Sequence, residues 1–246
     1  MQLTIVIPTY NEAKNLSEMV SVLFSLPLPG LKVLVVDDNS PDGTGRVADE
    51  LAVTHRGKLS VIHRLGKMGL GTAYLEGFKQ ANQEGAEAIG QMDADFSHPP
   101  DKLIELEQAL ATCDVALGSR YISGGALDTR WPFWRKGLSA FGNTYARKIL
   151  GLPIKDVTGG FRLWRRETLQ GIPIERVRSN GYAFQIEMAY LAHRLGYKIV
   201  EIPIYFSDRR WGQSKMSLRI QQEAALRVWQ MKFEYRDLLR PHHRVI

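Results

Sequence analysis

Two aspartates, Asp93 and Asp95, stand one residue apart in the stretch "GQMDADFSHPP", directly after a short apolar run. Neighbouring carboxylates repel each other, and a divalent cation bound to a diphosphate removes that repulsion. Magnesium and manganese prefer oxygen ligands and commonly take one or two carboxylates together with phosphate oxygens. The motif suits a metal–diphosphate site, but in a lone D-x-D it is more common that one aspartate caps the following helix and the other is solvated.

Two further polar segments follow apolar runs in the same way. "PTYNE" (8–12) comes after a run at 3–7, and "VVDDNSPDGT" (35–44) overlaps the end of a run at 32–37. In open parallel sheets, ligands bind beyond the carboxyl ends of the strands. If these runs are parallel strands, all three polar segments lie on one rim, which favours the site over a chance motif.

The first half of the chain alternates β-branched runs with amphipathic stretches, which is typical of βαβ units. The pattern predicts an α/β fold whose strands lie parallel. Strands are expected near 3–7, 32–37, 59–63, 87–92 and 114–118. Helices are expected in 11–26, 69–85 and 100–112. "GLG", residues 69–71, lacks the full G-x-G-x-x-G and is expected to be a tight strand-to-helix turn.

The second half is less regular. We expect a loop of aromatic and basic residues at 129–143, a Gly-rich turn at 156–162, a helix at 184–196, a strand at 197–206 and a helical stretch at 215–239. No repeat or linker divides the chain. We expect a catalytic domain over 1–215, followed by an amphipathic helical segment over 216–246.

Composition excludes some classes of protein. The chain has 246 residues, 44% of them hydrophobic, a formal charge of +6 and a pI near 9.4, which favours anionic partners. Cys113 is the only cysteine, so no intrachain disulfide forms, and no signal peptide is recognised, so the cytoplasm is the expected location. Apolar runs are too short to cross a bilayer. Basic residues do not interleave with aromatics on a strand, so nucleic acid is not expected as a partner.

Together the motifs resemble the dolichyl- or polyprenyl-phosphate mannose synthases of glycosyltransferase family 2. They are, in chain order, "IPTYNE", "VDDNSPDGT", "MDADFSHPP", "GSRY", "DVTGGFRLWRRETL", "GYAFQIEM" and "DRRWGQSK". "PTYNE" and "DDNS" are typical of family 2 in general, whereas "GSRY", "TGGFR" and "DRRWGQSK" resemble the polyprenyl-phosphate branch. The resemblance extends from about Leu3 to Ser217.

This resemblance implies a GT-A fold with a Rossmann-like, mostly parallel central sheet flanked by helices. It implies inverting transfer of mannose from GDP-mannose to a dolichyl or polyprenyl phosphate, with Mg²⁺ or Mn²⁺ as cofactor. The enzyme is expected at the cytoplasmic face of a membrane, and a small membrane protein is a partner that the resemblance allows. Two alternatives stay open: the same fold using UDP-glucose, and a nucleotide-sugar-binding regulator without turnover.

The resemblance also assigns site residues by position. Donor-binding positions are Pro8, Tyr10, Glu12, Val36, Asp38, Asp93, Ala94, Asp95, Arg209 and Lys215. The resemblance implies that Asp95 and Asp93 bind the metal. Ser97 occupies a position where some relatives have glutamine. Tyr10 can stack on the base and Asp38 can accept a hydrogen bond from base or ribose. We also expect Asp37 or Asp38 to serve the turn that follows its strand.

A lipid phosphate acceptor needs orientation rather than deprotonation, because a phosphate monoester is already anionic near neutral pH. Arg120 is one expected ligand for phosphate. Arg135 and Ser139 lie four residues apart on a predicted helix, where both could face one phosphate, and the resemblance places an acceptor-binding Arg and Ser at this spacing. Arg130 is an alternative to Arg135, since the preceding loop is one residue longer than in some relatives.

Three other residues could take part in chemistry. Glu187 and Asp156 are candidates for a general base, but we expect both to form hydrogen bonds that support the Gly-rich turn. His98 lies beside the D-x-D motif, and no other histidine is spaced to pair with it, so no role is predicted for it.

The C-terminal segment combines apolar and basic residues. It holds Leu218, Ala225, Val228, Trp229, Met231 and Phe233 among Arg219, Arg227, Lys232, Arg236 and Arg240. That composition suits a helix lying at an anionic membrane surface, but it also suits a helix that packs on its own domain. Both readings stay open at this point.

Overall fold

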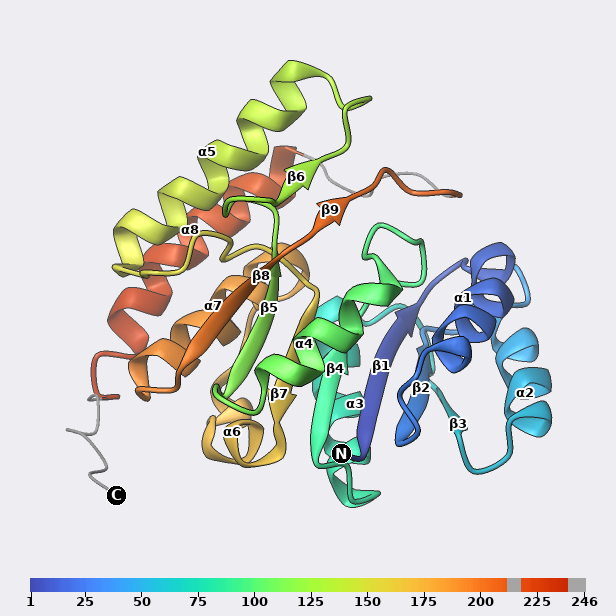
Figure 1. Ribbon diagram of the computed structural model, residues 1–246. Helices are drawn as coiled ribbons and strands as arrows, with labels where there is room; N and C mark the ends of the chain where they lie inside the picture. The colour runs from blue at the N-terminus through green and yellow to red at the C-terminus, as the bar shows by residue number, and fades with distance from the viewer. Residues whose placement is uncertain (212–217, 239–246) are drawn as a thin grey trace.

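The computed structural model describes residues 1–211 and 218–238. A seven-stranded sheet crosses the molecule in the order β3-β2-β1-β4-β7-β5-β8 (Figure 1). Its strands are β1 Leu3–Thr9, β2 Leu31–Asp37, β3 Leu59–His63, β4 Ala88–Gln91, β5 Val115–Ser119, β7 Arg162–Arg165 and β8 Ile199–Pro203. Pairings are parallel except those of β7, which runs antiparallel to both β4 and β5. The predicted mostly parallel α/β fold is confirmed.

Helices cover both faces of this sheet. They are α1 Ala13–Ser25, α2 Thr44–Thr54, α3 Leu70–Gln83, α4 Leu103–Ala109, α5 Phe133–Leu150, α6 Arg166–Gly171, α7 Gly181–Arg194 and α8 Leu218–Glu234, with 3₁₀ turns η1 Pro100–Lys102 and η2 Ile174–Arg176. Alternate residues of β1 point to opposite faces. Ile5 packs in a cluster with α1, α2 and α4, whereas Val6 packs in a cluster with α3, α5, α7 and α8.

The five strands predicted in the first half are present, each within two residues of its expected bounds. The "GLG" turn is also confirmed, since α3 begins at Leu70 and Gly69 has a φ of 100°, which favours glycine. The predicted strand at 197–206 was wrong as a single element. β8 ends at Pro203, and Tyr205–Phe206 forms β9, which pairs with β6 (Ala126–Leu127) in a separate two-stranded sheet.

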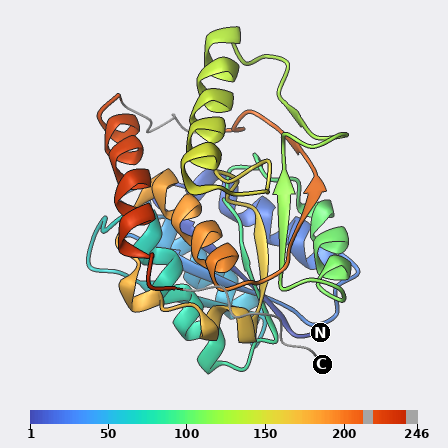
Figure 2. The same cartoon turned by 90° about the vertical axis from the view of Figure 1, so that its left-hand side faces the viewer.

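The stretch 129–143 was predicted as a loop with a helix only around Arg135 and Ser139, whereas α5 begins at Phe133 and continues to Leu150. α8 lies against α5 and α7 (Figure 2). Val228 and Met231 of α8 are buried in the shared core. The C-terminal helix therefore packs on its own domain through one face. No stretch of the described helices has the length and apolar character that a bilayer span requires.

Candidate active site at the rim of the parallel sheet

The loops after β1, β2 and β4 meet at one edge of the sheet. β1 and β2 end in register, with Thr9 opposite Asp37, and β4 lies on the other side of β1. Each loop holds one non-glycine residue with a positive φ: Asn11 at 63°, Asn39 at 55° and Phe96 at 62°. Such conformations are rare, particularly for a bulky residue like phenylalanine, and they gather at ligand sites. The predicted common rim is confirmed.

The first loop brings Pro8, Tyr10 and Glu12 to this rim. The ring of Tyr10 is half-buried, and Nζ of Lys67, from the loop after β3, lies 4.5 Å from its centroid. Glu12 occupies the N-cap position of α1, and its Oε2 accepts a hydrogen bond from Nδ2 of Asn15 at 2.7 Å. Tyr10 and Glu12 thus both lie at the rim, and Glu12 also supports the start of the helix.

The second loop holds two buried aspartates with different roles. Asp37 shapes the turn, since its carboxylate accepts hydrogen bonds from the Thr9 hydroxyl at 2.8 Å and from the backbone N–H and hydroxyl of Ser40 at 3.0 and 2.6 Å. The expectation that one aspartate serves the turn is confirmed. Asp38 pairs with Arg64, whose Nη1 lies 2.6 Å from Oδ1. The Val36 side chain is fully buried in the core, so it does not line the rim.

The third loop presents Asp93 and Asp95. Asp95 is buried, and its Oδ1 accepts a hydrogen bond from the backbone N–H of Ser97 at 3.0 Å. Oδ1 of Asp93 accepts a hydrogen bond from the hydroxyl of Tyr74 at 3.4 Å. Burial, and then the charge of Asp95, raise the pKa of Asp93. Ala94, the residue between these two aspartates in the sequence, has a buried side chain.

His98 holds this loop in shape. Its Nδ1 accepts a hydrogen bond from the backbone N–H of Asp93 at 3.1 Å, and its ring stacks on Phe161 with centroids 5.2 Å apart. Burial lowers the pKa of the imidazole, so the ring is neutral and able to accept at Nδ1. The sequence assigned no role to His98. The signal available was its place five residues after Asp93, where a side chain can reach back to the turn.

The donor set of this loop fits a divalent cation that also binds a diphosphate. The described residues contain no group of three or more His, Cys, Asp or Glu side chains around one point. Mg²⁺ and Mn²⁺ need no such group, because one or two carboxylates plus phosphate oxygens suffice. Ser97 adds a buried hydroxyl oxygen that hydrogen-bonds no described group. Asp93, Asp95 and Ser97 thus offer oxygen ligands at one turn.

The segment after β9 closes over this loop. Nε of Arg209 lies 3.1 Å from Oδ2 of Asp95, and the backbone N–H of Arg210 donates to the Asp95 carbonyl at 3.2 Å. Burial opposes the charge of Arg209, but Asp95 and then Asp93 outweigh it, so the pKa of Arg209 is raised. Arg209 therefore stays cationic beside the carboxylates. Lys215, the other expected cation, lies outside the described residues.

Arg120 follows β5 and is fixed by Asp156 in the Gly-rich turn. Nε of Arg120 lies 2.7 Å from Oδ2 of Asp156, Nη2 lies 2.7 Å from Oδ1, and Nη2 also donates to the Thr158 hydroxyl at 2.7 Å. Burial raises the pKa of Asp156, but Arg120 outweighs it and the net shift is downward. A carboxylate so occupied is a poor base, as the sequence led us to expect.

Arg135 and Ser139 lie on α5 as predicted, but they have different partners. Nη1 of Arg135 lies 3.3 Å from Oδ1 of Asp208, and its guanidinium lies 3.6 Å from the ring centroid of Trp131. The Ser139 hydroxyl shares a hydrogen bond of 2.7 Å with the hydroxyl of Tyr121. Both side chains are half-buried. An acceptor phosphate would therefore compete with Asp208 for Arg135.

Arg130 and Glu187 are committed to other contacts. Arg130 is exposed and paired with Asp128, its Nη2 lying 2.6 Å from Oδ2. Glu187 is buried, and its carboxylate accepts hydrogen bonds from Nη2 of Arg227 at 2.6 Å and from the Tyr235 hydroxyl at 2.7 Å. It also accepts from two backbone N–H groups that precede α7. Glu187 therefore fastens α8 to α7, and the prediction that it supports the Gly-rich turn was wrong.

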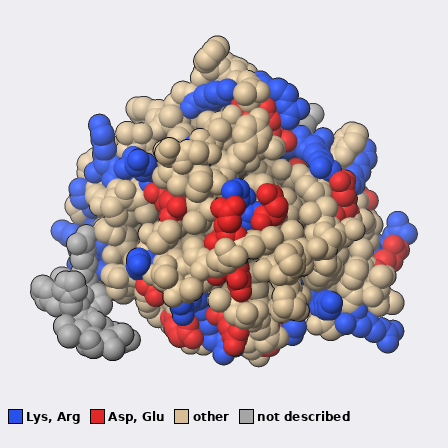
Figure 3. Space-filling model, in the orientation of Figure 1, with Lys and Arg blue, Asp and Glu red and all other residues tan. Residues whose placement is uncertain are grey.

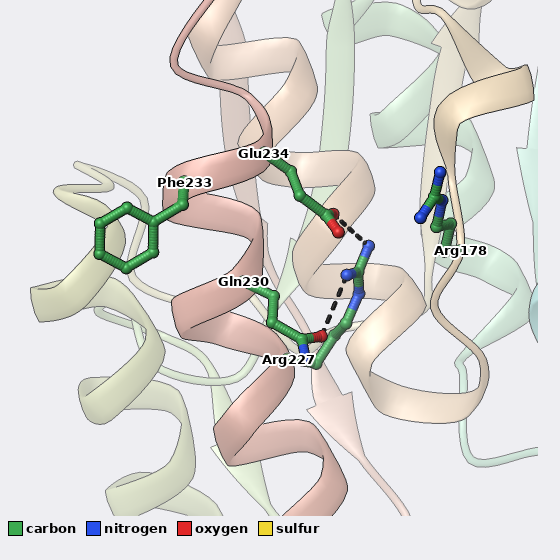
Figure 4. A pocket seen from close by; sticks show the side chains of 5 residues that line it. All are labelled: Arg178, Arg227, Gln230, Phe233 and Glu234. Atoms are coloured by element: carbon green, nitrogen blue, oxygen red, sulfur yellow. Dashed lines mark hydrogen bonds and ion pairs between the residues drawn. The ribbon is translucent and has the colours of Figure 1, made fainter.

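A cavity of about 540 Å³ lies beside this contact rather than at the rim. Its lining is Arg178, Arg227, Gln230, Phe233 and Glu234. Figure 4 shows Arg227 between Gln230 and Glu234, with which it forms a hydrogen bond and an ion pair. Two arginines, Arg178 and Arg227, and one carboxylate, Glu234, line the cavity, and Arg227 also pairs with Glu187.

Comparison with known proteins agrees with this geometry. The family model described as glycosyl transferase family 2 matches residues 4–172. The chain belongs to glycosyltransferase family 2. It is a glycosyltransferase, and the reading as a regulator without turnover is set aside.

Its relatives include three named enzymes. The chain is 45% identical to the polyprenol monophosphomannose synthase of Mycolicibacterium smegmatis, over 91% of this chain and 84% of that protein. It is 43% identical to the undecaprenyl-phosphate mannosyltransferase of Micrococcus luteus, over 93% of each. The dolichol-phosphate mannosyltransferase of Pyrococcus furiosus is 37% identical over 88% of this chain, which spans only 59% of that protein.

Solved structures of lower identity share the fold of this glycosyltransferase. A mannosyltransferase from Pyrobaculum calidifontis, in complex with GDP-Man and Mn²⁺, has a TM-score of 0.63 and 20% identity over 95% of this chain and 64% of that one. The glucosyl-3-phosphoglycerate synthase of Mycobacterium tuberculosis, in complex with Mg²⁺ and UDP, has a TM-score of 0.68 and 16% identity over 94% of this chain and 79% of that one. The predicted GT-A-like α/β fold is thus confirmed.

Proposed function

We propose that this glycosyltransferase moves mannose from GDP-mannose to a polyprenyl or dolichyl phosphate, with a divalent metal as cofactor. The main support is that relatives at 43–45% identity, matched over more than nine-tenths of this chain, are named for mannosyl transfer to polyprenyl phosphates. The rim carries acidic and basic side chains of the kind that bind a sugar diphosphate. UDP-glucose remains the alternative donor.

The donor would lie along the rim. Tyr10 packs on the base, Asp38 accepts a hydrogen bond from base or ribose, and Asp93, Asp95 and Ser97 would hold the cation. When bound, Mg²⁺ or Mn²⁺ neutralises the diphosphate and stabilises the leaving nucleotide. Arginine can bind phosphate oxygens through two N–H groups.

Two cations flank this part of the rim. Arg209 approaches the diphosphate from the segment that closes over Asp95. Arg120 approaches from β5, where Nε and Nη2 are bound to Asp156, so the guanidinium has a fixed direction. Fixed cations stabilise negative charge as it develops on the leaving group, because they need no reorganisation during the reaction.

The acceptor needs no general base in this scheme. Its phosphate monoester already carries negative charge, so the protein has only to hold one oxygen in line with the anomeric carbon, and a single displacement inverts that centre. Arg135 would bind the phosphate in exchange for Asp208, and Ser139 would donate a hydrogen bond. The carboxylates of Asp156 and Glu187 are engaged elsewhere.

A donor panel tests the proposal. Purified protein is incubated with a short polyprenyl phosphate and, in separate reactions, with GDP-mannose, UDP-glucose and other radiolabelled sugar nucleotides. We expect one lipid-linked product, from GDP-mannose, that disappears with excess EDTA. If only UDP-glucose gives a product, the donor is UDP-glucose and not GDP-mannose. Transfer undiminished by EDTA would refute the metal requirement.

We also propose that the enzyme meets its acceptor at the cytoplasmic face of a membrane, through exposed aromatics on α5 and α8. Trp134 and Phe141 of α5 are 70% and 68% exposed, and Trp229 and Phe233 of α8 are 45% and 55% exposed. Tyr145 joins the two helices, because its ring stacks on Phe141 at 6.2 Å and its hydroxyl accepts a hydrogen bond from Nε1 of Trp229 at 3.0 Å. These five residues form what we call the aromatic surface.

Basic residues accompany the aromatic surface. Nζ of Lys232 lies 5.6 Å from the ring centroid of Trp229, and the Arg236 guanidinium lies 5.2 Å from that of Phe233. At the top of the view in Figure 3, where the N-terminal end of α5 lies in Figure 1, uncharged side chains stand above basic ones that have a few acidic side chains beside them. Aromatic and basic side chains together favour the interface of an anionic bilayer.

Surface substitutions test this contact better than a truncation, because α8 also contributes to the core. The variant Trp134→Ser/Phe141→Ser should float less than the wild type with vesicles that contain an anionic phospholipid. Val53→Ser removes another exposed apolar side chain, 63% exposed on α2, and should float like the wild type. Equal flotation of all three folded proteins would remove the aromatic surface from the proposal.

A further inference from the structure

Arg64 lies directly after β3 and joins the end of β2 to the start of α3. Its Nη1 donates to Oδ1 of Asp38 at 2.6 Å, and its Nη2 donates to the Thr72 hydroxyl at 2.6 Å. Its backbone N–H donates to the Asp37 carbonyl at 2.8 Å, and Nε lies 3.2 Å from Oε2 of Glu76. Arg64 is therefore held on three sides while its guanidinium faces Asp38.

Arg64 is too buried to bind a nucleotide directly. Its side chain is 2% exposed, whereas that of Asp38 is 8% exposed and lies on the rim beside the loop that carries Tyr10. Oδ2 of Asp38 accepts no hydrogen bond from the described residues, although Oδ1 is taken by Arg64. Burial of a carboxylate is costly unless a counter-charge compensates its lost hydration. Arg64 supplies that charge and fixes the direction of the carboxylate.

We infer that Arg64 is a positioning residue for base selection, acting through Asp38. This inference rests on the proposed function, in which Asp38 contacts the donor base. An ionised carboxylate only accepts hydrogen bonds. It therefore favours bases with a ring N–H, namely guanine at N1 and uracil at N3, over adenine and cytosine, whose corresponding nitrogens are acceptors. The selection applies whether the donor carries guanine or uracil.

Equilibrium binding of nucleoside diphosphates measures this selection without an acceptor. Calorimetry with the full chain and Mg²⁺ gives Kd values for GDP, ADP, UDP and CDP. In the wild type we expect a preference of about tenfold or more for GDP over ADP, or for UDP over CDP, because a hydrogen bond to a charged group is lost in the disfavoured base. Arg64→Gln should reduce that preference to less than about threefold, and Arg64→Lys should retain part of it.

A double-mutant cycle separates positioning from a general structural effect. Asp38→Asn should lose the preference, and adding Arg64→Gln to Asp38→Asn should change the preference no further, since the two residues act as one unit. Arg46→Gln removes a charge from α2 at a side chain that is 78% exposed, and should leave the preference intact. The thermal midpoint of each variant is recorded to confirm folding.

The outcomes distinguish the inference from the proposed function. If the wild type binds none of the four diphosphates, the proposed function fails. If the wild type selects GDP over ADP or UDP over CDP and folded Arg64→Gln keeps the same ratio, the role of Arg64 is refuted. A further loss of preference when Arg64→Gln is added to Asp38→Asn would also refute it, because Arg64 would then act without Asp38.

Discussion

The pair between Asp156 and Arg120 gives a prediction that separates a scaffold from a general base. Both carboxylate oxygens of Asp156 bind Arg120, through its backbone N–H at 2.9 Å and through Nε and Nη2, each at 2.7 Å. Asp156 is fully buried. Asp156→Asn keeps the shape of the side chain but removes its charge and turns one acceptor into a donor. The variant leaves the buried Arg120 without a counter-charge.

The magnitude follows from this geometry. Breaking a buried ion pair by removing one partner costs about 3–5 kcal/mol of unfolding free energy. In a chain of this size about 1 kcal/mol shifts the thermal midpoint by about 2–4 °C, so Asp156→Asn should unfold about 6–20 °C below the wild type. Because Arg120 loses its fixed direction, kcat/KM should fall as well.

The pH dependence has a definite sign. The folded-state pKa of Asp156 is lowered from its usual 3.8, so the stabilisation is fully present above that value and is lost as the pH falls through the folded-state pKa. The stability gap between wild type and Asp156→Asn should therefore be constant from neutral pH to about pH 5 and should narrow in more acidic solution.

Thermal unfolding of Asp156→Asn across that pH range checks the stability, and transfer assays of Asp156→Ala with and without formate check the chemistry, because the shorter side chain leaves room for the added base. We expect the stability loss, and we expect that formate does not restore activity. A variant as stable as the wild type whose activity returns with formate would show that Asp156 removes a proton in the reaction, and the mechanism without a base would be refuted.

Three further substitutions follow from the contacts at the site. Arg135→Ala should raise the acceptor KM about tenfold or lower kcat, with donor affinity changed less than about twofold, as measured by initial rates and calorimetry; an equal loss of donor affinity would contradict this. Glu187→Gln weakens the bonds to Arg227 and should lower the thermal midpoint while the nucleotide Kd is retained, and an unchanged midpoint would refute its role in fastening α8. His98→Ala leaves the backbone N–H of Asp93 unpaired, which costs about 1–3 kcal/mol, and should weaken donor binding more than His98→Asn; equal binding by both would remove His98 from the loop's support.

Strands that consist of a continuous run of apolar, mostly β-branched residues could be predicted from the sequence. β7, which has no such run, could not. β1, "LTIVIPT", is buried along its length and shows a simple apolar pattern. β7, "RLWR", contains two arginines, one of which, Arg162, is buried because three backbone carbonyls accept its N–H groups. Those carbonyls come from the Gly-rich turn and α7, so the sequence around β7 does not reveal its burial. α5 was partly hidden by Gly137 and Gly142, which lower helix propensity.

The site divides in the same way. Asp38, Asp93 and Asp95 could be placed from sequence because each lies within four residues of the end of a strand, and strand ends fix the rim. Partners from distant segments could not be predicted. Arg64 is one example, because its pairing with Asp38 depends on how β3 lies beside β2. The exchange partner of Arg135 is another, since Asp208 is 73 residues away in sequence.

The most direct test of the central claim is the initial rate of mannosyl transfer by wild type and Asp95→Asn, measured side by side with GDP-mannose, a short polyprenyl phosphate and Mg²⁺ or Mn²⁺. Asp95 is the buried carboxylate that pairs with Arg209 and that we propose binds the cation. The wild type should form the lipid-linked mannose, and folded Asp95→Asn should lose about 100-fold or more of that rate, because the leaving nucleotide lacks its counter-ion. A folded Asp95→Asn variant that transfers mannose at the wild-type rate would contradict the assignment of the active site to this rim.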